Sequence, residues 1–404
     1  MAESAAQLRE HDGGPSSGLI LLLAISCGMA VANIYYAQPL IGLIAPSIGL
    51  GPAVAGLVVT LTQLGYCAGL ILLVPLGDLV ENRRLVALTL AGSTLALLAA
   101  GLATSAPVFL LASLLVGIAS VAVQMLVPLA AHMTPEARRG QVVGKVMSGL
   151  LLGILLARPA ASLIADHFGW RSVFILSAVL MAGLTVILSR RLPERRPHPQ
   201  AGYGALLRSL WPVLRDTPIL RRRAAYQTAQ FCNFSLFWTA VPLHLMESPF
   251  HLSQTGIALF ALAGAAGALV APLSGWLADR GLTRPSTGLA FAFALCAFVI
   301  AWLGRDSLAA LVVAAVVLDA GVQMTQIQGQ RAIYTLRAEI RSRLNGLYMA
   351  IFFLGGAVGS TMASLLFTQG GWTGVAWFGG AVALAGMAYY LTELTGRQAA
   401  LAGR

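Results

Sequence analysis

The sequence predicts an all-α integral membrane protein with twelve transmembrane helices in two parallel six-helix repeats. Three observations lead to this prediction. Of the 404 residues, 58% are hydrophobic and 10% are charged, whereas soluble domains carry about 25% charged residues. The chain contains twelve apolar runs, close to the roughly 20 residues that a helix needs to cross a bilayer. Polar residues of the first half recur in the second half at one offset.

The predicted transmembrane helices are separated by short polar gaps. They cover residues 18–46, 53–76, 85–104, 107–131, 141–165, 172–190, 224–246, 254–276, 287–303, 308–331, 344–368 and 374–393. The longest gap divides them six and six. We therefore expect a cytoplasmic N-terminal tail at 1–17, an N-terminal six-helix bundle at 18–190, a cytoplasmic central linker at 191–223, a C-terminal six-helix bundle at 224–393 and a cytoplasmic tail at 394–404. A short amphipathic helix is expected on the membrane surface at about 203–215.

The internal repeat rests on matches at an offset of 202 residues. This offset places Gln124 on Gln326, Arg139 on Arg341, Gly153 on Gly355, and the pair Gly169-Trp170 on Gly371-Trp372. Matches of Gln, Arg and Gly-Trp at a single offset are hard to obtain by chance. Repeats of this kind are typical of secondary transporters, whose substrate sites lie near the bilayer midplane between the two halves.

The basic residues indicate how the chain is oriented in the membrane. Most of the 26 Lys and Arg residues fall in loops on the side of the N-terminus, and only Arg171 and Arg305 fall in loops on the other side. By the positive-inside rule, both termini are expected in the cytoplasm and the chain in the cell (inner) membrane. Because the net charge of +11 is scattered over helix ends, no nucleic-acid partner is expected.

Two polar gaps place an acid beside a turn and follow it with arginine. Residues 77–84 read Gly-Asp-Leu-Val-Glu-Asn-Arg-Arg, and residues 275–284 read Gly-Trp-Leu-Ala-Asp-Arg-Gly-Leu-Thr-Arg. An Asp at one helix end can pair with an Arg that begins the next helix and so latch the two helices together. The second stretch resembles the loop signature of the major facilitator superfamily, and the first is a weaker match. The predicted latch residues are Gly77, Asp78, Arg83, Arg84, Gly275, Asp279, Arg280 and Arg284.

This resemblance covers nearly the whole chain and is to the 12-helix group of drug and metabolite:proton antiporters. It implies a monomer in which two six-helix halves rock around a central site. Helix 5 of such antiporters resembles Gly-x-x-x-Gly-Pro; here Gly153 and Ala157 keep the two small positions, but Arg158 stands in place of the proline. This departure favours an anionic or zwitterionic substrate. Helix 4 often carries Arg in the superfamily, and Gln124 is the polar residue there in this chain.

Two ionisable residues lie away from the predicted helix ends, Arg158 in helix 5 and Asp319 in helix 10. A charge in hydrocarbon costs about 2.5–3.5 kcal/mol on insertion scales, so each of them predicts a role. Arg158 is expected to bind an anionic group of the substrate through its fork of donors. Asp319 is expected to exchange the coupling proton. The alternative is a buried pair that serves only the structure.

Uncharged polar residues gather on the helices that line the cavity in the superfamily. Gln323 and Gln326 share one helical face with Asp319, as expected for the wall of a water-filled cavity. Hydrogen bonding between helices is the alternative. The predicted substrate-binding residues are Asn33, Tyr36, Gln38, Gln63, Gln124, Arg158, Gln230, Asn233, Trp238, Gln323 and Gln326.

The predicted function is secondary active transport of a small organic solute by alternating access, as proton-coupled efflux. A passive facilitator or an importer of an organic anion is the alternative, and a membrane-embedded enzyme is a distant one. The sequence has no His, Asp and Glu cluster at metal-ligand spacing and no Gly-x-Ser-x-Gly nucleophile motif, which argues against an enzyme. Residues 140–146 lack the spacing of a phosphate-binding loop. We therefore expect no metal, cofactor or nucleotide, a proton gradient as the energy source, and only substrate and lipid as partners.

Overall fold

Helices form all the regular structure in the described part of the chain, residues 14–197, 202–336 and 340–402 of a computed structural model. The first half comprises α2 (Ser17–Ala32), α3 (Ala37–Ser47), η1 (Pro52–Val54), α4 (Leu57–Leu72), η2 (Val74–Asp78), α5 (Asn82–Leu102), α6 (Ala106–Ser120), α7 (Ala122–His132), α8 (Glu136–Phe168) and α9 (Trp170–Arg191). After α10 (Tyr203–Asp216), the second half comprises α11 (Pro218–Met246), α12 (Gln254–Gly264), η3 (Ala265–Val270), α13 (Ala271–Asp279), α14 (Thr283–Leu303), α15 (Leu308–Tyr334) and α16 (Arg341–Ala402).

These helices account for the twelve predicted spans. Within the described residues, nine helical stretches are long and apolar enough to cross a membrane, and the bent pair of α2 and α3 adds a tenth. One of the nine, α16, contains two predicted spans, because Gly371 interrupts it with a φ of 58°. The one span still to be accounted for is α11, which has 29 residues but is too rich in polar side chains to be counted among the nine.

Proline and glycine set the breaks between helices. The helix predicted at 18–46 is two helices bent by 43°, because Pro39 has no N–H and its ring crowds the carbonyl group of Tyr35. Gly169 separates α8 from α9 with a φ of 81°, as Gly371 does in α16. These two glycines are equivalent in the internal repeat, and a positive φ is easily adopted only by a residue without Cβ.

Several predicted boundaries differ from the structure. The amphipathic linker helix is confirmed as α10. The next helix begins at Pro218 and not at 224, so Arg221, Arg222 and Arg223 lie in its first turns. The last helix continues to Ala402 and takes in most of the predicted C-terminal tail. Most of the predicted N-terminal tail, residues 1–13, lies outside the described part of the chain.

Glycines allow the central helices to pack backbone to backbone. A Cβ on Gly149 or Gly153 of α8 would lie 2.3 Å from the carbonyl oxygen of Ala24 or 2.2 Å from that of Gly28 in α2. The equivalent helices of the second half pack in the same way, since a Cβ on Gly355 of α16 would lie 2.3 Å from the carbonyl oxygen of Thr228 in α11. The small residues predicted in helix 5 are therefore where α8 touches α2, as small residues do between membrane helices.

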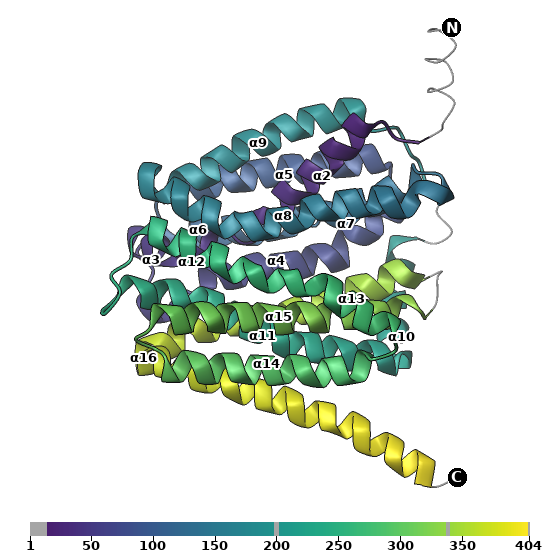
Figure 1. The fold of residues 1–404 in the computed structure, drawn as a ribbon. Coiled ribbons are helices and arrows are strands. Elements are labelled where there is room, and N and C mark those ends of the chain that lie inside the picture. Colours follow the sequence, from purple (N-terminus) through teal and green to yellow (C-terminus); the bar gives the residue numbers. More distant parts are fainter. Residues whose placement is uncertain (1–13, 198–201, 337–339, 403–404) are drawn as a thin grey trace, which may run out of the picture.

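The two halves lie against each other along their length. Figure 1 shows the first half in purple and blue above the second half in green and yellow, with their helices running in similar directions. Contacts between them join α4 to α16, α8 to α12 and α3 to α11. In the same view α2 begins and α16 ends at the same end of the bundle. The linker helix α10 lies at this end, with Tyr203 donating a hydrogen bond to the carbonyl oxygen of Leu72.

Candidate functional site

A cavity of about 490 Å³ lies between the two halves, and we call it the central cavity. Helices of both halves contribute to its wall, and it extends toward the end of the bundle that carries α10. Its polar and aromatic lining residues are Tyr35, Tyr66, Gln124, Arg158, Phe231, Phe234, Asp319, Gln323, Gln326, Gln330, Tyr334, Arg341, Ser342, Asn345, Phe352 and Phe353. The size and mixed lining suit a small organic molecule.

Arg158 is buried at the wall of the central cavity among aromatic rings. Its Nε donates a hydrogen bond to Gln38 Oε1 at 2.8 Å. Its guanidinium carbon lies 5.0 Å, 4.8 Å and 4.6 Å from the ring centroids of Tyr35, Phe234 and Trp238. One guanidinium nitrogen, Nη2, has no hydrogen-bond partner among the described residues. The rings hold the cation in place, and Nη2 is buried without a hydrogen bond to any described residue.

Asp319 lies in the same cavity, but the two charged groups do not form an ion pair. No nitrogen of Arg158 comes within 4.0 Å of the Asp319 carboxylate among the ion pairs of the described residues. Instead, Trp238 Nε1 donates a hydrogen bond to Asp319 Oδ1 at 2.9 Å. The direct buried pair that the sequence allows is therefore not formed, and an indole lies between the two groups.

Glycines next to α15 make room for this arrangement. A Cβ on Gly264 would lie 2.5 Å from the Trp238 ring, and a Cβ on Gly267 would lie 2.6 Å from Asp319 Cβ. Both distances are shorter than side-chain atoms tolerate, so only glycine fits at either position without a shift of its neighbour. The segment from α12 to η3 thus fixes where the indole and the carboxylate lie.

The glutamine face of α15 does line the central cavity. Gln323, Gln326 and Gln330 are among the residues of its wall. Gln328 points elsewhere and donates a hydrogen bond to the carbonyl oxygen of Ser274. On the opposite wall, Gln124 donates to the hydroxyl group of Tyr66 at 3.1 Å. Amide groups from both halves therefore offer donors and acceptors to a bound solute.

Two of the predicted binding residues lie inside the first half, away from the central cavity. Asn33 donates to Ser93 and accepts a hydrogen bond from Ser177, so its amide is used within the bundle. Tyr36 is 7% exposed and does not line the cavity either. Of the residues between α2 and α3, Tyr35 is the one that lines the cavity.

Three others serve packing around the cavity. Gln63 donates to the hydroxyl group of Ser235 at 2.8 Å and so links the two halves. Gln230 donates to the carbonyl oxygen of Ala290 in α14. Asn233 is fully buried, and neither of its amide atoms has a partner among the described residues. None of these three residues is part of the wall of the central cavity.

The aromatic part of the site was not predicted as a unit. Phe231 and Phe234 line the cavity, and with Trp238 they lie at positions i, i+3 and i+7 of α11, on one helical face. This spacing is present in the sequence, but a row of aromatic residues at helical spacing is also typical of an apolar core. Tyr35 completes the group from the other half.

The predicted latch in the second half forms pairs other than the expected ones. Asp279 pairs with Arg331 near the end of α15 and not with the arginine that begins α14. Arg284 pairs with Glu393 of α16 at 3.0 Å. The pairing expected across one loop is not formed in this structure, because α15 and α16 bring closer partners to both ends of the loop. Arg280 lies over the ring of Trp276 at 3.6 Å, and a Cβ on Gly275 would meet open space.

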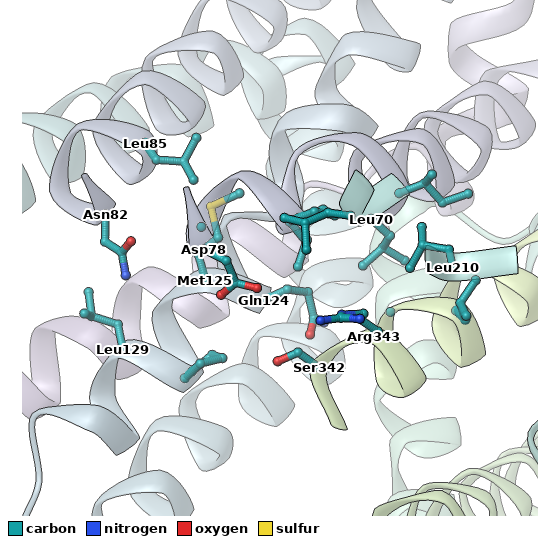
Figure 2. A pocket seen from close by; sticks show the side chains of 18 of the residues that line it. Leu70, Asp78, Asn82, Leu85, Gln124, Met125, Leu129, Leu210, Ser342 and Arg343 are labelled. Carbon is teal, nitrogen blue, oxygen red and sulfur yellow. The ribbon is translucent and has the colours of Figure 1, made fainter. Parts of the chain in front are cut away.

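The first-half latch is also arranged differently. Arg83 pairs with Glu194, and Arg84 lies 3.7 Å from Glu81. Asp78 lines a smaller pocket of about 90 Å³ near α10, next to Gly77. In Figure 2 the side chains of Asp78, Gln124 and Arg343 point toward the middle of this pocket. Asp78 has no ion pair within 4.0 Å in the described part of the chain.

Polar contacts join the halves at the end of the bundle opposite α10. The hydroxyl groups of Thr60 in α4 and Ser360 in α16 lie 2.8 Å apart. Asp166, near the end of α8, accepts a hydrogen bond from the backbone N–H of Thr255 at the start of α12. The halves are therefore closed on this side, whereas the central cavity extends to the other.

Comparisons with known proteins agree with this architecture. A family model described as Major Facilitator Superfamily matches residues 20–327 and 224–403. The uncharacterized transporter YgaY of Escherichia coli O157:H7 is 42% identical over 370 residues, which are 91% of this chain and 94% of YgaY. A gallate transporter of Pseudomonas putida is 25% identical over 78% of each chain. The crystal structure of a bacterial homolog of the human lysosomal transporter Spinster, inward-facing and unoccupied, has a TM-score of 0.76 at 15% identity, covering 93% of this chain and 96% of that one.

Proposed function

Because the chain belongs to the major facilitator superfamily and is a multi-pass membrane transporter, we propose that it couples proton movement to transport of a small organic anion. The observation that carries this proposal is the pair of buried charges in one cavity. Arg158 and Asp319 line the central cavity from opposite halves without an ion pair between them. Each is therefore available, Arg158 to an anionic group and Asp319 to a proton.

The lining of the cavity supports an aromatic carboxylate as the substrate class. The guanidinium of Arg158, at the cavity wall, offers charge-assisted donors to a carboxylate. Phe231, Phe234 and Phe353 offer ring faces, and the amides of α15 offer hydrogen bonds to hydroxyl groups. Gallate, the substrate named for the relative from Pseudomonas putida, is an aromatic carboxylate with hydroxyl groups. It is a reasonable first probe.

The charges favour movement of the anion together with a proton. An ionised Asp319 partly cancels the field of Arg158 in the low-dielectric cavity. When Asp319 binds a proton, the positive charge of Arg158 is left uncompensated and an anion binds more tightly. Binding of proton and anion is then cooperative and reciprocal, which drives uptake by symport in a membrane whose proton gradient points inward.

Efflux by proton antiport is the second candidate function. It is supported by the close packing of α8 on α2 through Gly149 and Gly153, because the superfamily antiporters that this helix resembles have a close-packed fifth helix. A cationic or neutral solute that competes with the proton for Asp319 would be exported by such a cycle. The direction of proton movement separates the two candidates.

The remaining parts of the proposal concern the setting of the transporter. We place the chain in the cell (inner) membrane with both termini in the cytoplasm, as the basic loops predict, and as a monomer. The cavity then opens to the cytoplasm, and Thr60 and Ser360 close the outer side. Asp279, through its pair with Arg331, and Asp78, in the small pocket near α10, are proposed to stabilise one state of the rocking cycle at the cytoplasmic side. No cofactor takes part, and the proton gradient supplies the energy.

Proteoliposomes with an internal pH dye test the proposal. Purified protein is given gradients of gallate, of cationic drugs and of sugars, and Asp319→Asn is compared with wild type and with Asp306→Asn, whose side chain is 70% exposed. We expect gallate uptake with acidification of the lumen in wild type and Asp306→Asn, and no proton signal in Asp319→Asn. Gallate uptake without proton movement in wild type would refute coupling, and alkalinisation of the lumen during uptake would favour antiport.

A further inference from the structure

Trp238 touches both charged residues of the central cavity, each with a different part of its indole. Its Nε1–H donates to Asp319 Oδ1 at 2.9 Å. The guanidinium of Arg158 lies over its ring face, and the guanidinium carbon is 4.6 Å from the ring centroid. The other charged residue that lines the cavity in the described part of the chain is Arg341, from the start of α16. The indole is therefore the connection between the anion-binding and the proton-binding group.

The two contacts of the indole reinforce each other. The ring has a negative face and a positive edge, so a cation over the face and a carboxylate at the N–H both lie where the ring attracts them. A carboxylate that accepts from the N–H also polarises the ring and strengthens its hold on the cation, as neighbouring polar groups do in a connected network. Loss of the carboxylate charge weakens both contacts together.

The indole is held firmly in this position. Trp238 is 2% exposed, and the rings of Phe237 and Phe260 lie 5.7 Å and 5.9 Å from it. Gly264 of α12 lies so close that an added Cβ would come within 2.5 Å of the ring. On the other side, Gln38 fixes the guanidinium through Nε. Neither partner can therefore slide past the indole without a rearrangement of α11 or α12.

We propose that Trp238 is the positioning residue that couples the proton to the anion. It keeps Arg158 and Asp319 apart as two separate sites, and its N–H transmits the loss of charge on Asp319 to Arg158. When Asp319 binds a proton, the contact between the ring and the guanidinium weakens, and Arg158 turns its free donors to the incoming anion. This inference rests on the proposed function and adds a role for a residue that the sequence predicted only as part of the substrate pocket.

The first test uses Trp238→Phe, which keeps a ring face for Arg158 but removes the N–H. Proteoliposomes are assayed for gallate uptake driven by a proton gradient and for exchange of labelled against unlabelled gallate, which needs no net proton movement. We expect uptake to fall at least tenfold while exchange stays within about twofold. Trp372→Phe is the matched control, because Trp372 is also buried but donates its N–H to the carbonyl oxygen of Ala301, away from the cavity.

A purely structural role would lower uptake and exchange together, and this result would overturn the inference. Gly264→Ala is a second variant that keeps the N–H but displaces the ring, with Gly183→Ala as its control because a Cβ there meets open space. Gly264→Ala should also lose more of the proton-driven uptake than of the exchange. Wild type that moves gallate without protons would instead refute the proposed function, so the two failures are distinguishable.

A structure of Trp238→Leu tests the spacing without any substrate. With the indole removed, we expect the Arg158 guanidinium and the Asp319 carboxylate to meet within 4.0 Å as a direct ion pair. If they stay as far apart as in the wild type, the indole is not what separates them and the inference is wrong. If they pair, the same variant should bind both the proton and gallate more weakly than the wild type does.

Discussion

Replacement of Gly153 by alanine should separate two central helices of the first half. The new Cβ would lie 2.2 Å from the carbonyl oxygen of Gly28 and 2.5 Å from its Cα. Ordinary contact begins at 3.4 Å, so α2 and α8 must move apart by about 1 Å, and backbone atoms cannot rotate away as a side chain can. Overpacking of this kind destabilises by about 1–3 kcal/mol. The gain of about 0.8–1.0 kcal/mol from placing Ala for Gly in a helix offsets part of this.

The control is Gly183→Ala in α9, where a Cβ meets no atom within 4 Å. Only the helix-propensity gain remains there, so its stability should not fall. Both variants are purified in the same detergent and their unfolding is followed by tryptophan fluorescence on heating. We expect Gly153→Ala to melt below wild type and Gly183→Ala at or above it. Equal melting temperatures for the two variants would show that α2 and α8 do not pack in this way.

Two further predictions concern the ion pairs at the α10 end of the bundle. Glu393→Gln leaves three arginines without their shared carboxylate and should lower the melting temperature. We expect a loss of about 2–4 kcal/mol of stability, because Glu393 is only 11% exposed but two of its partners are 30% and 39% exposed. The control Asp306→Asn, at a side chain that is 70% exposed, should melt like wild type. Asp279→Asn frees Arg331 and should slow gallate flux while the gallate affinity stays within about threefold; a large affinity loss at normal flux would contradict the latch role.

The helical framework was readable from the sequence because membrane burial depends on composition over a local window. Twelve apolar runs became the spans, and the repeated Gly169 and Gly371 became helix breaks. Arg158 and Asp319 stood out for the same reason, since a charge within an apolar run is conspicuous whatever its surroundings. The linker helix α10 followed from its own amphipathic pattern.

Pairings between distant residues could not be predicted in this way. Asp279 meets Arg331 and Arg284 meets Glu393, because the ends of α15 and α16 arrive there from positions far along the chain. The amide of Asn33 was expected in the cavity, yet it is used inside the first half by Ser93 and Ser177. A polar residue on a membrane helix must find a partner, but its sequence position does not say on which side of the helix that partner lies.

From the order of its residues alone it follows that this protein crosses the membrane many times, that its halves repeat, and that one arginine and one aspartate lie deep within it. The membrane crossings and the two deep charges follow from the transfer of side chains from water to hydrocarbon, which each segment undergoes independently, and the repeat follows from matching residues at one offset. The folded arrangement adds that the two charges share a cavity, that Trp238 lies between them and that Nη2 of Arg158 is left unbonded. These features depend on which helices are neighbours and how they are rotated about their axes, which the packing of all of them settles together.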